Sequence, residues 1–323
     1  MRSRGRRRSG DGRMSHVASL LSIEELPAED LVRLLGKAQQ FEARTSAPPA
    51  TRTGFAAFLS ERESVRTRLA VHGAAAMLGM DAVDLDFASS FYADPARRGD
   101  HASFVEAELA SMRELGCAAV VIRMHDHSVL LSWRELTAIP LINGCSNEEH
   151  PLQALSDALV IAKCFGRMEG VRLVLVGNGV SPVFRSLVFL SARLKMNVLL
   201  ACPEGYGFPP EIARKAGLEH ASLHMHDLAE ALEGADVVYS DSVVYRALTA
   251  AEEEAFAPYR LTAATVARHA PEAYIMHCLP HADEIDAELI HGDRSLVMRQ
   301  VAARVPVTAA AIDWLARGVR EGI

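Results

Sequence analysis

The middle of the chain alternates short apolar runs with segments of helical spacing. The runs AAVVIR (118–123) and RLVLVG (172–177) are continuous and rich in β-branched residues, a pattern typical of strands covered on both faces of a parallel sheet. Nine strands are predicted, over 55–59, 81–87, 117–123, 139–142, 173–177, 196–202, 222–225, 237–240 and 273–277. Strands that alternate with helices indicate an α/β fold.

Apolar residues at helical spacing predict helices over 64–79, 104–115, 152–165 and 183–194, and a final helix over about 308–317. The helix that begins near Pro151 separates two blocks of four or five strands. We therefore expect two parallel-sheet α/β domains. The last helix is followed by no strand, so we expect it to return to the first domain.

Length and composition agree with two ordinary globular domains. The chain has 323 residues, of which 50% are hydrophobic and 23% charged, and this excludes a disordered protein. No apolar run approaches eighteen residues, so we expect no membrane span. Five cysteines without a CxxC pair predict neither a disulfide framework nor a structural zinc site, and they fit a reducing cytoplasm.

Charge is distributed unevenly along the chain. Residues 1–13 hold six arginines and one aspartate, which leaves −12 on the remainder of a chain whose formal net charge is −7. A net charge this negative makes the remainder of the chain poorly suited to bind nucleic acid. We interpret residues 1–15 as a disordered basic tail or as an extension before a true start at Met14. An RNA-binding or targeting arm is the alternative, although no apolar stretch follows to make a secretory signal.

The first candidate for chemistry is the string Ser64-Val65-Arg66-Thr67-Arg68, which follows a predicted strand. Ser64 suits a helix N-cap, so free N–H groups, the helix dipole, the Thr67 hydroxyl and two guanidinium groups converge there. These groups suit an anion, above all a phosphate. Taken alone, such a string is more often a solvated basic helix start.

Three further motifs lie at predicted strand or helix ends. Arg123 ends a strand at the edge where α/β folds bind ligands, whereas His125 and His127 lack a third metal ligand and are interpreted as surface loop residues. His150 precedes Pro151, which suits a first helical position, and can donate to a developing oxyanion. HCLP (277–280) presents the Cys278 thiol, which taken alone is best read as a buried, inert cysteine.

In this order, SxRTR, an arginine at a strand end, HPxQxLxD and HCLP resemble the aspartate and ornithine carbamoyltransferase family, and HCLP resembles its ornithine branch. The likeness runs from about residue 24 to the end. It implies that residues 16–154, with the returning helix at 300–323, bind carbamoyl phosphate, and that residues 155–299 bind the amine acceptor. It also implies a homotrimer with active sites between subunits.

The resemblance assigns catalytic roles to Arg66, Thr67, Arg123, His150 and Cys278. It assigns carbamoyl phosphate binding to a larger set: Ser64, Val65, Arg66, Thr67, Arg123, His150, Gln153, Cys278, Leu279 and Arg304. The chemistry agrees, because arginines and helix N–H groups can neutralise a leaving phosphate while His150 stabilises the carbonyl oxygen. We expect no metal and no other cofactor.

Two departures concern the phosphate side. Val65 replaces the second hydroxyl residue of the family's STRTR loop, although the helix N–H groups remain. The loop 92–101 lacks an evident glutamine of the ornithine enzymes but contains Arg97 and Arg98. One of these arginines is a candidate phosphate ligand in a neighbouring subunit, and a solvated pair is equally favoured.

Larger departures concern the acceptor. Asp241 is kept, but Ser-Val-Val-Tyr follows it in place of Ser-Met-Gly. The Asn pair and the further Asn expected after the strand 173–177 are not matched, because the run there is Gly177-Asn178-Gly179-Val180-Ser181. We therefore expect an amino-acid-like primary amine other than ornithine, or a broader set, such as a diamino acid or an amine of a specialised metabolite. Asp241 would bind an ammonium group, Arg185 a carboxylate, and Cys278 would shape the pocket. A solvated Arg185 is an equal alternative.

Other classes of function stay open at this point. One is an ordinary ornithine carbamoyltransferase, making citrulline with a diverged pocket. A second is a dinucleotide-binding protein using Gly177-Asn178-Gly179, which is weak without a third glycine. A third is a catalytically silent paralogue, disfavoured because the candidate catalytic residues are all present. The expected partners are carbamoyl phosphate and a small amine, without nucleic acid or membrane.

Overall fold

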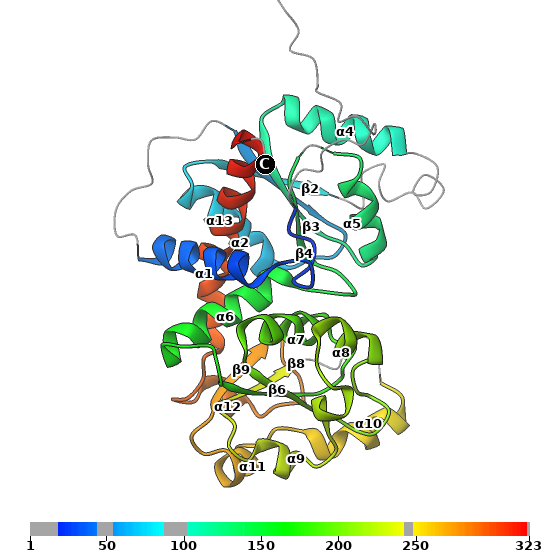
Figure 1. Ribbon diagram of the computed structural model, residues 1–323, viewed down its shortest axis with the longest axis vertical. Helices are drawn as coiled ribbons and strands as arrows, with labels where there is room; N and C mark the ends of the chain where they lie inside the picture. The colour runs from blue at the N-terminus through cyan, green and yellow to red at the C-terminus, as the bar shows by residue number, and fades with distance from the viewer. Residues whose placement is uncertain (1–18, 44–53, 87–101, 138, 242–247, 322–323) are drawn as a thin grey trace, which may run out of the picture.

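The computed structural model describes residues 19–43, 54–86, 102–137, 139–241 and 248–321, and it contains two parallel sheets (Figure 1). The first has the order β2-β1-β3-β4 and consists of β1 (Phe55–Ser60), β2 (Asp81–Asp86), β3 (Cys117–Arg123) and β4 (Leu141–Cys145). The second has the order β7-β6-β5-β8-β9 and consists of β5 (Arg172–Val176), β6 (Asn197–Ala201), β7 (His224–Met225), β8 (Val237–Asp241) and β9 (Tyr274–Cys278). The prediction of two parallel α/β domains is confirmed.

Helices cover both faces of the first sheet. Along β1, Ala56 and Phe58 pack into the core beneath α1 (Ala28–Glu42) and α2 (Val65–Met77). Ala57 and Leu59 pack into the opposite core with α4 (Ala102–Glu114) and α5 (His127–Arg134). Because successive side chains of a strand point to opposite faces, an apolar run such as FAAFL serves both cores at once.

The second sheet is covered in the same way. On one face lie α7 (Pro182–Leu194) and α8 (Pro210–Ala216), in the large core that also contains Leu173 and Leu175 of β5. On the other face lie α9 (Leu228–Leu232), α11 (Ala263–His269) and α12 (Ala287–His291), with Val174 and Val176. The short α10 (Ala250–Phe256) and a 3₁₀ turn (Ala257–Tyr259) lie beyond the carboxyl end of β8.

Two helices join the domains. α6 (Pro151–Phe165) runs between them, and α13 (Val297–Glu321) extends from β9 to pack against α1, α2 and α6. The return of the last helix is confirmed, but it is longer than the predicted 308–317. Pro306 lies inside it, and an interior proline is a strong helix-breaking signal, so the first part of the helix is hidden from pattern analysis.

Other differences are local. α1 was not predicted, although its buried residues Leu31, Leu34, Leu35, Ala38 and Phe41 have the helical spacing. The interpretation of His127 as a loop residue is wrong, because it begins α5 after the Asp126 cap. No described helix is long and apolar enough to cross a bilayer. The basic tail and the loop with Arg97 and Arg98 lie outside the described residues.

Candidate active site

The Ser64-Val65-Arg66-Thr67-Arg68 motif lies at the carboxyl edge of the first sheet. β1 ends at Ser60, paired with Arg123 of β3, and the chain then enters α2 through the N-cap residue Ser64. The Ser64 hydroxyl lies 3.0 Å from the Thr67 hydroxyl and 3.4 Å from the Thr67 N–H. The prediction that Ser64 opens a helix is confirmed, and the helix N-terminus faces the edge where α/β folds bind ligands.

Distant segments meet this helix end. Nη2 of Arg304, from α13, donates to the Thr67 hydroxyl at 3.0 Å and lies 3.3 Å from Nε2 of His150. The Arg66 guanidinium donates to the Leu279 carbonyl and so joins the first domain to the turn after β9. The structure thus brings together the helix of the first domain, the start of α6, the last helix and the HCLP turn.

The contact with Arg304 fixes the tautomer of His150. A guanidinium group has donors and no acceptor, so Nε2 must accept and the ring proton lies on Nδ1. Nδ1 is buried and has no partner among the described residues. Burial, and then the charges of Arg304, Arg123 and Arg66, hold the pKa of His150 well below its usual range. His150 is therefore a neutral imidazole with an unused N–H donor.

Positive charge accumulates around this histidine. Within the described part of the chain, none of Arg66, Arg123 and Arg304 pairs with a carboxylate. Arg304 is buried, and burial together with the neighbouring arginines lowers its pKa. Because buried charges require compensation, the site is built for an anionic ligand.

Cys278 belongs to the second domain, where it is the last residue of β9. It pairs in register with Asp241 across β8 and β9. Burial, and then the Asp241 charge, raise the pKa of the Cys278 thiol well above its usual value. A thiol in this state is a poor nucleophile, so its chemistry is that of a neutral, weakly polar contact.

A buried carboxylate supports the other side chains. Asp157 Oδ1 accepts from Gln153 and from Gln300, each at 2.8 Å, and Oδ2 accepts from the Tyr239 hydroxyl at 3.0 Å. The side-chain oxygen Oε1 of Gln300 accepts the backbone N–H of His277 at 3.0 Å. Asp157 was visible in the HPxQxLxD motif without a role, whereas nothing in the sequence placed Tyr239 and Gln300 beside it.

The two predicted acceptor residues, Asp241 and Arg185, each contact a different neighbour. Asp241 Oδ2 accepts from the Ser181 hydroxyl, at the start of α7, at 2.6 Å. Arg185, one turn later, pairs with Glu148. Its guanidinium is therefore already engaged by a carboxylate, which the sequence did not indicate. Asp241 is buried at the carboxyl end of β8.

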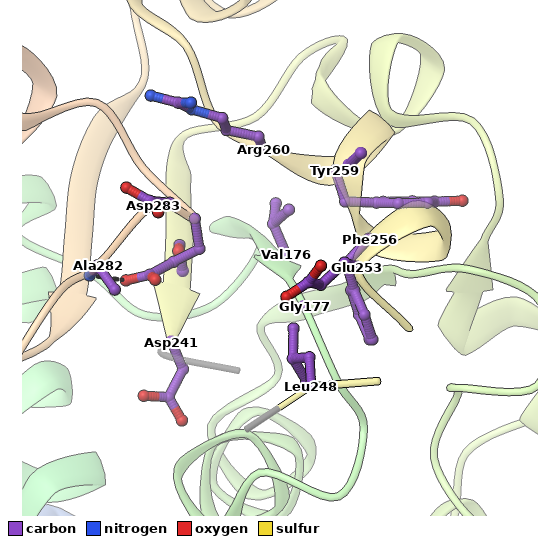
Figure 2. A pocket seen from close by; sticks show the side chains of 13 residues that line it. Val176, Gly177, Asp241, Leu248, Glu253, Phe256, Tyr259, Arg260, Ala282 and Asp283 are labelled. Carbon is purple, nitrogen blue, oxygen red and sulfur yellow. Dashed lines mark hydrogen bonds between the residues drawn. The ribbon is translucent and has the colours of Figure 1, made fainter. Parts of the chain in front are cut away.

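Two hollows open beside these residues. One of about 260 Å³ lies by the first sheet and is lined by Arg62, Arg123, Met124, His125, Cys145, Ser146, Asn147, Val180 and Pro182. Another of about 430 Å³ lies in the second domain, at the carboxyl ends of β5 and β8 (Figure 2). The described residues contain no group of three or more side chains suited to hold a metal ion.

The glycines of the Gly177-Asn178-Gly179 turn have a packing reason. A Cβ on Gly179 would lie 2.4 Å from the carbonyl carbon of Gly207, so the turn tolerates no side chain there. Gly177 has a φ of 144°, a conformation that favours glycine. Dinucleotide binding is not needed to explain this turn.

Comparisons with known proteins agree with this geometry. Residues 18–163 match the carbamoyl-P binding domain of aspartate/ornithine carbamoyltransferase, and residues 169–315 match its Asp/Orn binding domain. Ornithine carbamoyltransferase of Bacillus subtilis is 31% identical over 303 residues, 91% of this chain and 92% of that protein. The protein of the same name from Methanothermobacter thermautotrophicus is 32% identical over 312 residues, 94% of this chain and 99% of that protein.

Solved structures show the same arrangement. Ornithine carbamoyltransferase from Thermus thermophilus superposes with a TM-score of 0.81 at 26% identity, covering 92% of this chain and 98% of that chain. The enzyme from Pyrococcus furiosus gives 0.80 at 27% identity, with 92% and 97% covered. Both domains and the returning helix therefore have close structural counterparts.

Proposed function

The chain belongs to the aspartate/ornithine carbamoyltransferase family, and it is therefore an enzyme that transfers the carbamoyl group of carbamoyl phosphate to an amine; we propose that the acceptor is a primary amine other than ornithine. Ornithine is the acceptor named for the relatives. Here the Ser-Met-Gly turn after Asp241 and the Asn pair with its further Asn after β5 are not kept. These losses remove polar partners, and each buried group left unpaired costs about 1–3 kcal/mol.

The observation that carries the donor side is the uncompensated positive site around His150. Arg66, Thr67 and the N-terminus of α2 bind the phosphate, and their charge favours its departure. The His150 Nδ1–H and the Arg123 guanidinium donate to the carbonyl oxygen as charge develops there. Gln153, held by Asp157, orients the carbamoyl amide. Cys278, Leu279 and Arg304 close the site, and Ser64 and Val65 supply the first turn of the helix.

The reaction then balances without an enzyme-bound intermediate. The lone pair of the neutral acceptor nitrogen attacks the carbamoyl carbon, the bond from that carbon to the phosphate oxygen breaks, and the departing phosphate takes up the proton that the nitrogen loses. The products are a substituted urea and inorganic phosphate. Asp241 binds an ammonium group of the acceptor. A substrate carboxylate binds Arg185 only by displacing Glu148.

The surface of α2 supports assembly as a homotrimer. Val65 and Leu69, four residues apart and hence on one face, are 66% and 63% exposed. We infer that this apolar face beside the helix is buried against a neighbouring subunit. Light scattering in solution tests this with an expected mass of three times 35.1 kDa. We assign the enzyme to the cytoplasm, where its cysteines stay reduced.

A thermal-shift experiment tests the donor site. Carbamoyl phosphate should raise the melting temperature because it binds only the folded state, and inorganic phosphate should do so less. NAD, as the control for a dinucleotide site, should have no effect. Stabilisation by NAD but not by carbamoyl phosphate would overturn the proposal.

A further inference from the structure

We infer that the 430 Å³ pocket of the second domain binds the non-reacting end of the acceptor, and that this end carries a positive charge and no carboxylate. The inference rests on the proposed carbamoyl transfer and names the chemical class of the amine. In the proposed acceptor, one amino group reacts and a second cationic group occupies this pocket. A diamine is the simplest such compound.

One wall of the pocket lies beside the strand that ends at Cys278. Its inner wall includes Asp241, which pairs in register with Cys278. From there it extends past Gly177 and Val176 of β5 toward α10 and the 3₁₀ turn (Figure 2). Its volume lies in the range of roughly 300–1,000 Å³ that is usual for small-molecule sites. One ligand can therefore reach both the carbamoyl group and the pocket.

The charges that line this pocket are mainly negative. Its described lining contains four carboxylates, from Asp241, Glu253, Asp283 and Glu284, and one cation, Arg260. The Arg260 guanidinium is paired with Asp286 at 2.9 Å and extends away from Glu253 (Figure 2). Among the described lining residues, a substrate carboxylate would meet like charge without an available counter-charge, whereas an ammonium group would be attracted.

Glu284 gives a second, independent indication of a cation. Its side chain is only 9% exposed, and Oε1 accepts from His277 Nε2 at 2.8 Å and from the Ala282 N–H at 2.9 Å. The other oxygen, Oε2, is buried and has no partner among the described residues. Burial raises the pKa of Glu284, but these hydrogen bonds outweigh it and hold the pKa below its usual value. An ionised carboxylate with an unused oxygen is a binding partner for a cation.

The apolar part of the wall suits the body of such a ligand. Phe256 and Tyr259 are both buried, and Leu248 and Val176 also line the pocket. The Tyr259 hydroxyl donates to the His226 carbonyl at 2.7 Å, which fixes the ring in place. Methylene groups can pack on these side chains, and a cation near an aromatic face gains further attraction.

Three acceptors that differ by one group test the inference. Putrescine has two amino groups on four carbons, n-butylamine lacks the second amino group, and ornithine adds a carboxylate to the putrescine skeleton. With saturating carbamoyl phosphate, kcat/KM for putrescine should exceed that for each of the other two by at least about tenfold. Equal or higher values for ornithine or n-butylamine would overturn the inference while leaving carbamoyl transfer established. No ureido product from any amine would instead contradict the proposed function.

A matched pair of variants locates the effect. Glu253 and Glu254 are neighbours on α10 and both are exposed, but only Glu253 lines the pocket. Glu253→Gln should raise KM for putrescine about three- to tenfold without changing kcat or the kinetics with n-butylamine, as expected for a partly solvated ion pair. Glu254→Gln should change neither. Identical behaviour of the two variants would show that this pocket does not hold the second cation.

Discussion

Removing the His150 imidazole should lower kcat far more than it changes the binding of carbamoyl phosphate. Nδ1–H is a buried donor without a partner among the described residues, and we assign it to the oxygen on which charge develops. Loss of one such donor typically costs about 10²–10³ in kcat, or about 2.7–4 kcal/mol. The contact strengthens mainly in the transition state, so KM should move much less. This is the expected result for His150→Ala.

Two conservative variants distinguish the ring nitrogens. The side-chain NH₂ of asparagine can occupy the position of Nδ1, and that of glutamine the position of Nε2. Because Arg304 lies against Nε2 at 3.3 Å, His150→Asn should retain more kcat than His150→Gln. Initial rates of phosphate release measure both. A more active glutamine variant, or an alanine variant with wild-type kcat, would refute the tautomer and the role we assign.

The burial of His150 among arginines also predicts how activity and stability depend on pH. Burial and three arginines keep the pKa of His150 well below its usual 6.5, so kcat/KM, which reports the free enzyme, should show no His150 titration between pH 6 and 8. Its depressed pKa also means that the unfolded chain takes up this proton first. Folding stability linked to His150 is therefore present above pH 6.5 and is lost as the pH falls.

Further predictions concern three residues around the same site. Arg66→Ala should lower kcat/KM for carbamoyl phosphate by a factor that corresponds to about 2–4 kcal/mol of transition-state stabilisation, because a charge-assisted ligand is lost. Unchanged initial rates would show that Arg66 does not bind the phosphate. Cys278→Ser should keep partial activity, EDTA should leave the wild-type rate intact, and intact-mass spectrometry should find no carbamoyl adduct on Cys278. Asp157 has its pKa raised from 3.8 to about 7 by burial, against the hydrogen bonds from Gln300, Gln153 and Tyr239. The folded state thus keeps a proton that the unfolded chain releases. The free energy of unfolding should therefore fall by about 4 kcal/mol as the pH rises from 4 to 7 and beyond. Asp157→Asn should flatten urea-unfolding stability between pH 5 and 8, and an unaltered slope would disprove this pKa.

Local patterns were sufficient for the sheets and for the helix start at Ser64. Strands such as Cys117–Arg123 were predicted with their observed bounds because buried parallel strands are continuous apolar runs. Ser64 was predicted as an N-cap from its residue type and position, and the structure has it there. These features depend on residues close together in the chain.

Features set by contacts between distant segments could not be predicted in this way. Arg304 meets Thr67 across 237 positions, and Gln300 meets Asp157 across 143. Only the resemblance to a family pointed to Arg304, and nothing pointed to Gln300. Likewise, the ion pair of Arg185 with Glu148 depends on how α7 packs beside α6. Periodicity reports which face of a helix is buried, but not which partner it meets.

Isotope-labelled carbamoyl phosphate provides the most direct test of the central claim. The full-length enzyme is incubated with ¹³C-carbamoyl phosphate and with putrescine, 2,3-diaminopropionate, ornithine or aspartate, singly and together, and the products are analysed by mass spectrometry. We predict a ureido product that carries the labelled carbon, formed together with an equal amount of phosphate, with ornithine consumed after the preferred amine. Phosphate release no faster than in buffer, without labelled product from any amine, would contradict carbamoyl transfer. Rapid consumption of ornithine ahead of the others would contradict the proposed acceptor.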